Sequence, residues 1–296
     1  MPLSHDALSL GMNVQVQQAS ASAGLLGDTP ARDYVQKLQL FNSFAAPELR
    51  AAIERLDLEA GMRVVDAGCG TGEALPWLLQ AVEPGGLVVG FDLAAAHTRA
   101  AHACSVARTA VLQADLMKPP LARASFDLIW SVNTINHLRD PSQGIHTLAT
   151  LLRPGGRIAL GQSSLVPDMY FAWDARLERL TNEAVRQYYR ERYALDERAL
   201  ADIRSLVGLL RRAQLRHVSV HTCMIERVSP LARADEAYIL EAMIRGTWGE
   251  RLRPYLGGAD FAELGRLCDP RHAQFALRRL DFHFLQSFTL AVAEIA

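Results

Sequence analysis

Two hydrophobic periods alternate along the first half of the chain. Short continuous apolar runs predict five buried strands, at residues 63–66, 87–91, 109–113, 126–132 and 157–161. Apolar residues at helical spacing predict helices between them, at 73–82, 95–107 and 142–152, with Pro-Gly-Gly turns at 83–86 and 153–156. Residues 33–56 show helical spacing ahead of the first strand, and Pro47 marks the first turn of the second of two helices there. Strands that alternate with helices in this way form parallel sheets with helices on both faces.

The pattern changes after Ser164. Residues 169–193 are amphipathic and rich in Arg and aromatic side chains, and Asp196 is placed to cap a further helix that runs to Ala213. Strand-like runs at 217–223 and 282–292 enclose helical segments at 231–245 and 260–267. We therefore expect four regions: an N-terminal segment with cap helices (1–56), a core (57–164), a helical lid insertion (165–214), and C-terminal strands of the core (215–296) with a helical insertion at 231–278.

Composition narrows the class of protein. Half of the 296 residues are apolar and the net charge is −1, which excludes a disordered chain and argues against a generally basic nucleic-acid or membrane-surface binder. The four cysteines form no Cys-x-x-Cys pair, so we expect free thiols and no metal site. No apolar run reaches the roughly 20 residues of a membrane helix, and no cation precedes Arg32, so no leader is expected. A cytoplasmic enzyme is the default expectation.

A glycine-rich loop, Asp66-Ala67-Gly68-Cys69-Gly70-Thr71-Gly72, lies between a predicted strand and a predicted helix. Glycines allow a backbone to turn sharply and to approach a ligand closely. The loop has no Gly-Lys-Ser/Thr ending, so it is not a P-loop. Glu73 stands where the dinucleotide pattern requires Gly or Ala, and its charge would repel a pyrophosphate at the helix start. A nicotinamide oxidoreductase is therefore disfavoured.

Three acids stand at the ends of three predicted strands: Asp66, Asp92 and Asp115. The carboxyl ends of parallel strands border the crevice where open sheets bind ligands. Asp66 suits a cationic group, and Asp92 is placed to accept both hydrogen bonds from a ribose diol. Asp115 is placed to accept from an exocyclic amine, although all three acids also suit ordinary strand-end turns, Asp115 most of all because Pro119 and Pro120 follow it.

These motifs together resemble the class I S-adenosylmethionine-dependent methyltransferases, in particular a type-11-like small-molecule group. The matching segments are VVDAGCGTGEA (64–74), GFDL (90–93), QADL (113–116), FDLIWSVNTINHL (126–138) and LLRPGGRIAL (151–160), within a resemblance that spans residues 34–163. The resemblance implies an α/β fold: a Rossmann-like, seven-stranded, mostly parallel sheet with helices on both faces and a helical lid. It further implies that 282–292 is an antiparallel last strand and that 217–223 is its neighbour.

The resemblance also implies contacts with S-adenosylmethionine, residue by residue. Gly68, Gly70 and Gly72 would lie under the methionine part, and Asp66 would neighbour its ammonium group. Asn133 would face the methionine side and the methyl donor. On the nucleoside side, the implied contacts are Asp92 with the ribose, Leu93 beside the adenine, Asp115 at the adenine amine and Leu116 on the ring.

Methyl transfer needs a base only when the acceptor must lose a proton, as a hydroxyl does. His137, on the loop after the fourth predicted strand, is the candidate base, with a loop histidine of no catalytic role as the alternative. His283, two residues from Asp281 on a predicted strand, is the weaker candidate and is equally consistent with an ordinary strand histidine. His97 and the remaining histidines stand in no informative pattern. An available histidine favours O-methylation, with N- and C-methylation left open.

The aromatic stretch between residues 170 and 193 predicts the nature of the acceptor. Tyr170, Trp173 and Tyr188 are candidate substrate-binding residues for a small hydrophobic or aromatic metabolite, unless they only seal a lid against the core. We expect no nucleic-acid or membrane partner, and a homodimer is possible. The alternative function is an S-adenosylmethionine-binding fold that serves a non-methylating reaction or acts as a binding scaffold.

Overall fold

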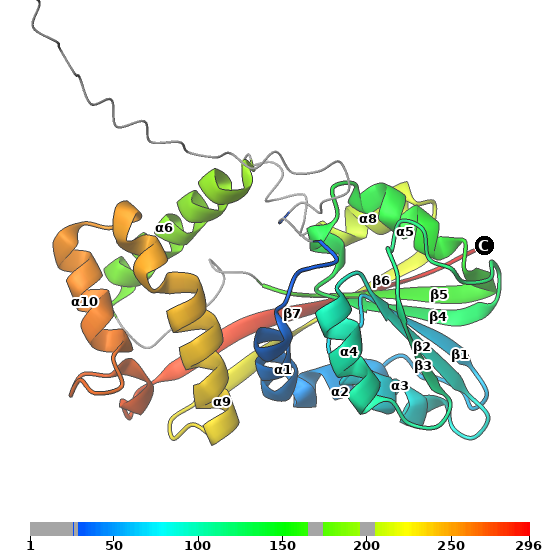
Figure 1. The fold of residues 1–296 in the computed structure, drawn as a ribbon, viewed down its shortest axis with the longest axis horizontal. Helices are drawn as coiled ribbons and strands as arrows, with labels where there is room; N and C mark the ends of the chain where they lie inside the picture. The colour runs from blue at the N-terminus through cyan, green and yellow to red at the C-terminus, as the bar shows by residue number, and fades with distance from the viewer. Residues whose placement is uncertain (1–25, 27–28, 165–173, 196–204) are drawn as a thin grey trace, which may run out of the picture.

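The computed structural model describes residue 26 and residues 29–164, 174–195 and 205–296. At its centre is a seven-stranded sheet in the order β3-β2-β1-β4-β5-β7-β6 (Figure 1). The strands are β1 (Arg63–Ala67), β2 (Leu87–Asp92), β3 (Thr109–Gln113), β4 (Phe126–Val132), β5 (Leu152–Ser163), β6 (Arg216–Val228) and β7 (His283–Glu294). β1 to β5 pair in parallel, and β7 runs antiparallel to β5 and β6. The predicted fold and both C-terminal strand assignments are confirmed.

The central strands are apolar on both sides because each side of the sheet carries a core. Successive residues of β1, Val64 and Val65, point into different clusters, and Leu128 and Ile129 of β4 do the same. All four side chains are fully buried. This double burial explains why the strands appear in the sequence as continuous apolar runs rather than alternating ones.

Helices cover both faces of the sheet. α2 (Ala46–Glu54) and α3 (Ala74–Val82) contribute buried residues to one cluster, and α5 (Pro141–Ala149) and α8 (Leu206–Arg212) contribute to the other. α4 (Ala95–Cys104) contacts β2 and β3, and α1 (Val35–Phe44) contacts α2 and α4. Pro47 lies in the first turn of α2, as predicted.

The turn predicted at 153–156 is part of a longer strand. β5 begins at Leu152, and its pairing with β4 moves from Phe126↔Leu152 to Leu128↔Arg157, so the residues between bulge from the sheet. Gly155 supplies the left-handed backbone that the bulge requires, with φ 75°. The Pro-Gly-Gly sequence therefore marks an irregularity within a strand, and the prediction of a separate turn is wrong.

A helical lobe lies beyond one end of the sheet (Figure 1). It comprises α6 (Ala175–Tyr193), α9 (Arg233–Ala237), a π-helical segment η2 (Tyr238–Trp248), a 3₁₀ segment η3 (Glu250–Tyr255) and α10 (Gly258–Cys268). α6 contacts η2 and η3, and α1 contacts η2 and α9, so the insertion at 231–278 joins α6 to α1. Asp174 caps α6 by accepting from the Leu177 N–H, whereas the predicted helix start at 169 and the predicted cap Asp196 lie outside the described residues. No described helix is long and apolar enough to cross a membrane.

Candidate functional site

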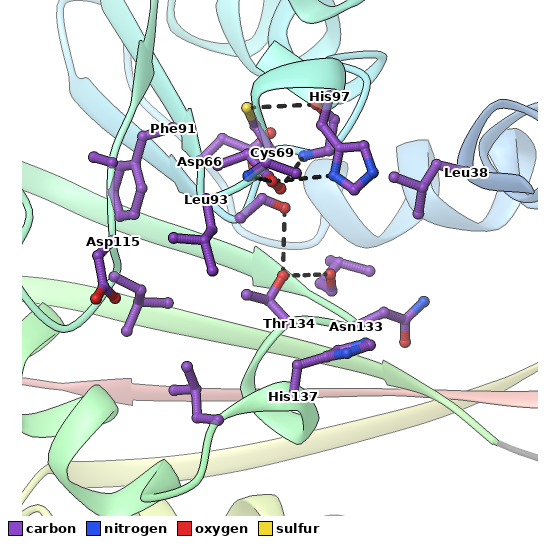
Figure 2. A pocket seen from close by; sticks show the side chains of 18 of the residues that line it. Leu38, Asp66, Cys69, Phe91, Leu93, His97, Asp115, Asn133, Thr134 and His137 are labelled. Carbon is purple, nitrogen blue, oxygen red and sulfur yellow. Dashed lines mark hydrogen bonds and ion pairs between the residues drawn. The ribbon is translucent and has the colours of Figure 1, made fainter. Parts of the chain in front are cut away.

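A cavity of about 660 Å³ opens at the carboxyl ends of the central strands. Figure 2 shows side chains from α1, the glycine loop and the ends of β2, β3 and β4 around it. The predicted site residues that line it are Asp66, Gly68, Gly70, Asp92, Leu93, Asp115, Leu116, Asn133 and His137. The cavity lies at the position where open parallel sheets bind ligands.

The glycines of the loop have different structural roles. A Cβ on Gly68 would lie 2.3 Å from the Thr134 side chain, and Gly68 has φ 78°, so only glycine fits there. Gly70 donates its N–H to Asp92 Oδ2 at 3.1 Å and lines the cavity. Gly72 does not line the cavity, and its missing side chain lets Ala101 of α4 approach, with a Cβ-to-Cβ distance of 2.8 Å if a Cβ were added. Its predicted place under a ligand stays a prediction.

Asp66 is the most perturbed acid of the site. Its side chain lies at the end of β1 with 2% of its surface exposed, and its Oδ2 atom has no hydrogen-bond partner among the described residues. Burial, and then the charges of Asp92 and Glu73, raise the pKa of Asp66 to about 8. Glu73 itself is held by the Asn42 amide and the Thr71 hydroxyl, each at 2.6 Å. Among the described residues, the charges that act on Asp66 are both negative.

Asp92 is held in place by three donors from the protein. Its Oδ2 accepts from the Gly70 N–H, and its Oδ1 accepts from the Ala94 N–H at 2.9 Å and faces His97 Nδ1 at 3.1 Å. His97 Nε2 accepts the Tyr34 N–H at 3.1 Å, so the ring proton sits on Nδ1 and is donated to Asp92. A carboxylate has about four acceptor positions, so a ligand hydroxyl must use the remaining one or share another. The contact of Asp92 with both ribose hydroxyls stays a prediction.

Sequence reasoning missed His97. It is buried, lines the cavity, and links the first residues of α1 to Asp92. The one available signal was its position five residues after Asp92, in the first turn of the helix that follows β2. That signal is weak, because the Tyr34 N–H that fixes the ring lies 63 residues away in the chain.

The third strand end provides an apolar wall with one acid at its rim. Leu93 and buried Leu116 line the cavity together with buried Phe91. Asp115 is exposed, and its Oδ1 accepts the Met117 N–H at 2.9 Å, which is the turn that its sequence context suggested. The same side chain also lines the cavity, so the turn and a ligand contact are compatible.

Asn133 ends β4 in a left-handed conformation, with φ 53°. Its Oδ1 accepts from the Ser163 N–H at 2.8 Å, the Ser163 hydroxyl at 2.9 Å and the Gln162 amide at 3.1 Å. These bonds fix the side-chain amide so that Oδ1 faces β5. In the described part of the chain its Nδ2 has no partner and remains available as a donor to a ligand.

His137 follows on the short 3₁₀ turn Ile135–His137 and lines the cavity. Burial, and then the positive charges of Arg32 and Lys37, lower the pKa of His137 to about 3, although Asp92 acts in the opposite direction. The imidazole is therefore neutral at physiological pH. It can accept a hydrogen bond or a proton, but its low basicity gives little driving force for proton removal, and its role as a base stays a prediction.

The structure does not bring His283, the alternative candidate base, to the cavity. His283 is the first residue of β7, its side chain is 44% exposed, and its Nε2 lies 2.7 Å from Glu226 Oε1 outside the cavity. Asp281, its expected partner, precedes the strand and binds Arg279 instead.

Of the three predicted substrate-binding aromatics, the structure describes Tyr188 alone. Tyr170 and Trp173 lie outside the described residues. Tyr188 of α6 packs edge-on against the rings of Tyr189 and Tyr255, with centroids 5.8 and 6.5 Å away, and does not line the cavity. This packing agrees with the alternative that Tyr188 seals the lobe.

Comparison with known proteins places the site in a recognisable context. The family model described as "Methyltransferase domain" matches residues 65–160, which include the glycine loop and the ends of β1 to β4. The chain is similar to the 27-O-demethylrifamycin SV methyltransferase of Amycolatopsis mediterranei, with 38% identity over 117 residues, or 38% of this chain and 42% of that protein. It is also similar to the methyltransferase GfsG of Streptomyces halstedii, with 38% identity over 110 residues, or 36% of this chain and 40% of that protein. The matched region thus spans about two fifths of these relatives.

The fold is shared more widely than the sequence. The YcgJ protein of Bacillus subtilis superimposes with a TM-score of 0.53 at 15% identity, over 86% of this chain and 98% of that one. At this identity the likeness establishes the fold alone, because one fold of this kind hosts many activities.

Proposed function

We propose that this chain transfers a methyl group from S-adenosylmethionine to a small acceptor, because residues 65–160 match the family model described as a methyltransferase domain. The observation that carries the proposal is the Asp66 carboxyl group, which lines the cavity and has a buried oxygen without a partner in the described part of the chain. A buried polar atom of this kind costs stability unless a ligand satisfies it. An ammonium group beside Asp66 would satisfy it.

The other residues of the cavity fit the same molecule. Asp92 offers its remaining acceptor capacity to a ribose hydroxyl, and Leu93 and Leu116 offer apolar surface to an adenine ring. Asp115 stands at the rim where an exocyclic amine would emerge. The acidic surroundings of Asp66 complement a ligand that carries both a sulfonium and an ammonium charge.

When bound, S-adenosylmethionine supplies an activated methyl group on a positively charged sulfur. The protein aligns the acceptor with that group and excludes water, since the departing thioether is neutral and needs no proton. Asn133, held rigidly by Ser163 and Gln162, orients the groups at the end of β4. Neutral His137 stands beside the same space to accept a hydrogen bond from the acceptor.

We further propose an oxygen acceptor on a small hydrophobic or aromatic metabolite of natural-product biosynthesis. Support comes from the relative that is named for an oxygen position of rifamycin, and from the apolar cavity residues Leu38, Phe41 and Leu49. A cytoplasmic location and a homodimer remain predictions.

Calorimetric titration tests the cofactor. We expect S-adenosylmethionine and S-adenosylhomocysteine to bind in the micromolar range, and reduced nicotinamide dinucleotide not to bind. Incubation with acceptor pools should then yield S-adenosylhomocysteine and a product heavier by one methylene unit. Absence of S-adenosylmethionine binding at millimolar concentration would refute the proposal, and binding without turnover on any pool would favour a scaffold role.

A further inference from the structure

Asp92 differs from the acid at the end of the neighbouring strand in how many donors hold it. Asp115 accepts the N–H of the residue two positions later, and Asp92 makes the same turn contact. Asp92 accepts two further hydrogen bonds, from the Gly70 N–H and from the His97 ring. In the described part of the chain, the turn contact is the one hydrogen bond of the Asp115 carboxylate. A strand-end turn therefore does not explain the contact between His97 and Asp92.

The three donors occupy defined positions on the Asp92 carboxylate. Oδ1 accepts from the Ala94 N–H at 2.9 Å and from His97 Nδ1 at 3.1 Å, and Oδ2 accepts from the Gly70 N–H at 3.1 Å. Each carboxylate oxygen has about two acceptor positions, so Oδ1 is fully used and Oδ2 keeps one. The Asp92 side chain is 15% exposed and lines the cavity. One acceptor position, on Oδ2, thus remains for a ligand.

The direction of the hydrogen bond from His97 is fixed by its second contact. His97 Nε2 accepts the Tyr34 N–H at 3.1 Å, and a ring nitrogen that accepts carries no proton. The proton of the neutral ring therefore lies on Nδ1 and is donated to Asp92 Oδ1. His97 is buried, so little water competes for either nitrogen. A ligand cannot use the Oδ1 position that His97 fills without breaking this hydrogen bond.

The chain segment on the far side of the ring is itself held against α4. Pro30 O accepts the Ala95 N–H at 3.0 Å, which anchors the segment to the first turn of the helix that carries His97. Thr29 and Tyr34 of this segment line the same cavity as Asp92. The imidazole is therefore clamped between two stretches of main chain, and its position at Asp92 does not depend on a bound ligand.

We propose that His97 determines how many ribose hydroxyls Asp92 recognises. By filling the second position of Oδ1, it restricts Asp92 to one hydroxyl of the cofactor's sugar, whereas a strand-end acid with free oxygens accepts both. His97 is thus a positioning residue that acts on the cofactor through Asp92. This inference rests on the proposed function and adds the way in which the sugar is recognised.

The test compares S-adenosylhomocysteine with its 2′-deoxy and 3′-deoxy analogues. Calorimetric titration of the full-length protein gives the dissociation constant of each ligand. We expect one analogue to bind at least about tenfold more weakly than S-adenosylhomocysteine, because it lacks a hydrogen bond to a charged acceptor. The other analogue should bind within about threefold of S-adenosylhomocysteine, because its missing hydroxyl has no partner on Asp92. Similar losses for both analogues, or no loss for either, would overturn the inference.

Two substitutions separate the two hydrogen bonds of His97. His97→Asn places an amide nitrogen near the position of Nδ1, so it keeps the donor to Asp92 and loses the contact with Tyr34. His97→Gln places its amide near Nε2, so it keeps an acceptor for Tyr34 and loses the donor to Asp92. We expect the difference between the two analogues to persist in His97→Asn and to fall within about threefold in His97→Gln, because Oδ1 then accepts the second hydroxyl. An unchanged difference in His97→Gln would overturn the inference.

The ratio of the two analogues' dissociation constants distinguishes this role from a merely structural one. Loss of packing at His97 would weaken binding of all three ligands alike and leave the ratio unchanged. His102→Gln is the matched control, because His102 lies exposed on the same helix and contacts the Thr98 carbonyl oxygen, and it should leave the ratio unchanged.

Urea denaturation shows whether each variant is folded. If His97→Gln is not, nitrogen NMR of the unmodified protein replaces it, with the His97 ring signals assigned by their absence in His97→Asn. We expect the ring proton on Nδ1. A proton on Nε2 would overturn the inference, because Nδ1 would then not donate to Asp92.

Failure of the inference and failure of the proposed function give different results. Binding of S-adenosylhomocysteine with equal losses for both analogues would keep the proposed function and overturn the inference. If neither S-adenosylhomocysteine nor S-adenosylmethionine binds, the proposed function fails, and adenosine and its 2′-deoxy and 3′-deoxy forms replace the three ligands. Absence of adenosine binding would then overturn the inference as well.

Discussion

Charges of opposite sign act on two groups of the site: acids act on Asp66 at the sheet edge, and cations act on His137 after β4. Asp66, Asp92 and Glu73 cluster on the sheet side, where burial and mutual repulsion raise the pKa of Asp66 to about 8. Arg32 and Lys37 lie on the helical side, where they help to lower the pKa of His137 to about 3. Holding like charges close together lowers the stability of the folded protein. Such groups are common where a ligand of complementary charge binds. The comparison therefore predicts that the acidic side binds a cationic group.

The largest expected effect concerns His137, which stands between the two sides. If it accepts the acceptor's proton, His137→Ala should lower kcat by about 10²-fold. Because its pKa is about 3, the imidazole stays neutral as the pH falls from 7 to 5, so kcat should not lose activity through this group over that range. Steady-state kinetics on an identified acceptor checks both points. A rate within threefold of the unmodified enzyme would leave His137 with a packing role and would agree with an acceptor that is already an anion.

The next effect concerns the acidic side. Asp92→Ala should weaken S-adenosylhomocysteine binding by about 1–3 kcal/mol, because it removes a charged acceptor together with the anchor of the Gly70 and Ala94 N–H groups. Asp115→Ala is the matched control, and we expect a smaller loss because that carboxylate is exposed. Calorimetry gives both values. Equal affinities for Asp92→Ala and the unmodified protein would contradict the assignment of Asp92 to the ligand.

A third substitution tests whether the glycine loop is fixed by packing. Gly68→Ala combines a left-handed φ with a clash against Thr134, whereas Gly61→Ala has a similar φ of 86° and no atom within 4 Å of the new Cβ. Urea denaturation should show Gly68→Ala to be less stable than Gly61→Ala by about 1–3 kcal/mol. Adding Thr134→Ala to Gly68→Ala should recover part of the difference. Similar stability of the two single variants would show that Thr134 simply moves aside.

The smallest expected effect is the release of one proton from Asp66 when the ligand binds. At pH 7 Asp66 holds a proton because its pKa is about 8, and an ammonium group placed beside it would stabilise the carboxylate and expel that proton. Calorimetry of S-adenosylhomocysteine binding in buffers of different ionisation enthalpy should therefore show release of up to about one proton. Asp66→Asn should abolish the release. Identical heats in all buffers would place the ligand's ammonium group away from Asp66.

The sheet side of the cavity was largely predictable, and the helical side was not. β3 and β4 have the predicted bounds, since strands buried on both faces appear as continuous apolar runs. An acid that ends such a run must lie at the carboxyl edge of the sheet, which is why Asp66, Asp92 and Asp115 meet around one space. Their positions follow from local sequence alone.

The helical side depends on contacts between distant segments. Arg32 and Lys37 come before the first strand and His137 follows β4, and no short sequence window shows that these charges act on His137. The π-helical segment Tyr238–Trp248 has an apolar spacing that looks like an ordinary helix. The interpretation of His283 relied on a residue nearby in the sequence, Asp281, as its partner. In the structure its partner is Glu226, which comes from the adjacent strand.

The imidazole of His97 joins the start of α1 to the end of β2. His97 Nε2 accepts a hydrogen bond from the backbone N–H of Tyr34, the N-cap residue of α1. His97 Nδ1 donates to Asp92, the carboxylate proposed to bind the ribose. Lifting α1 to admit a nucleoside would release that ring and leave Asp92 with two fixed donors instead of three. Binding of the nucleoside and packing of α1 against His97 are thus thermodynamically linked. Each should favour the other by the same factor.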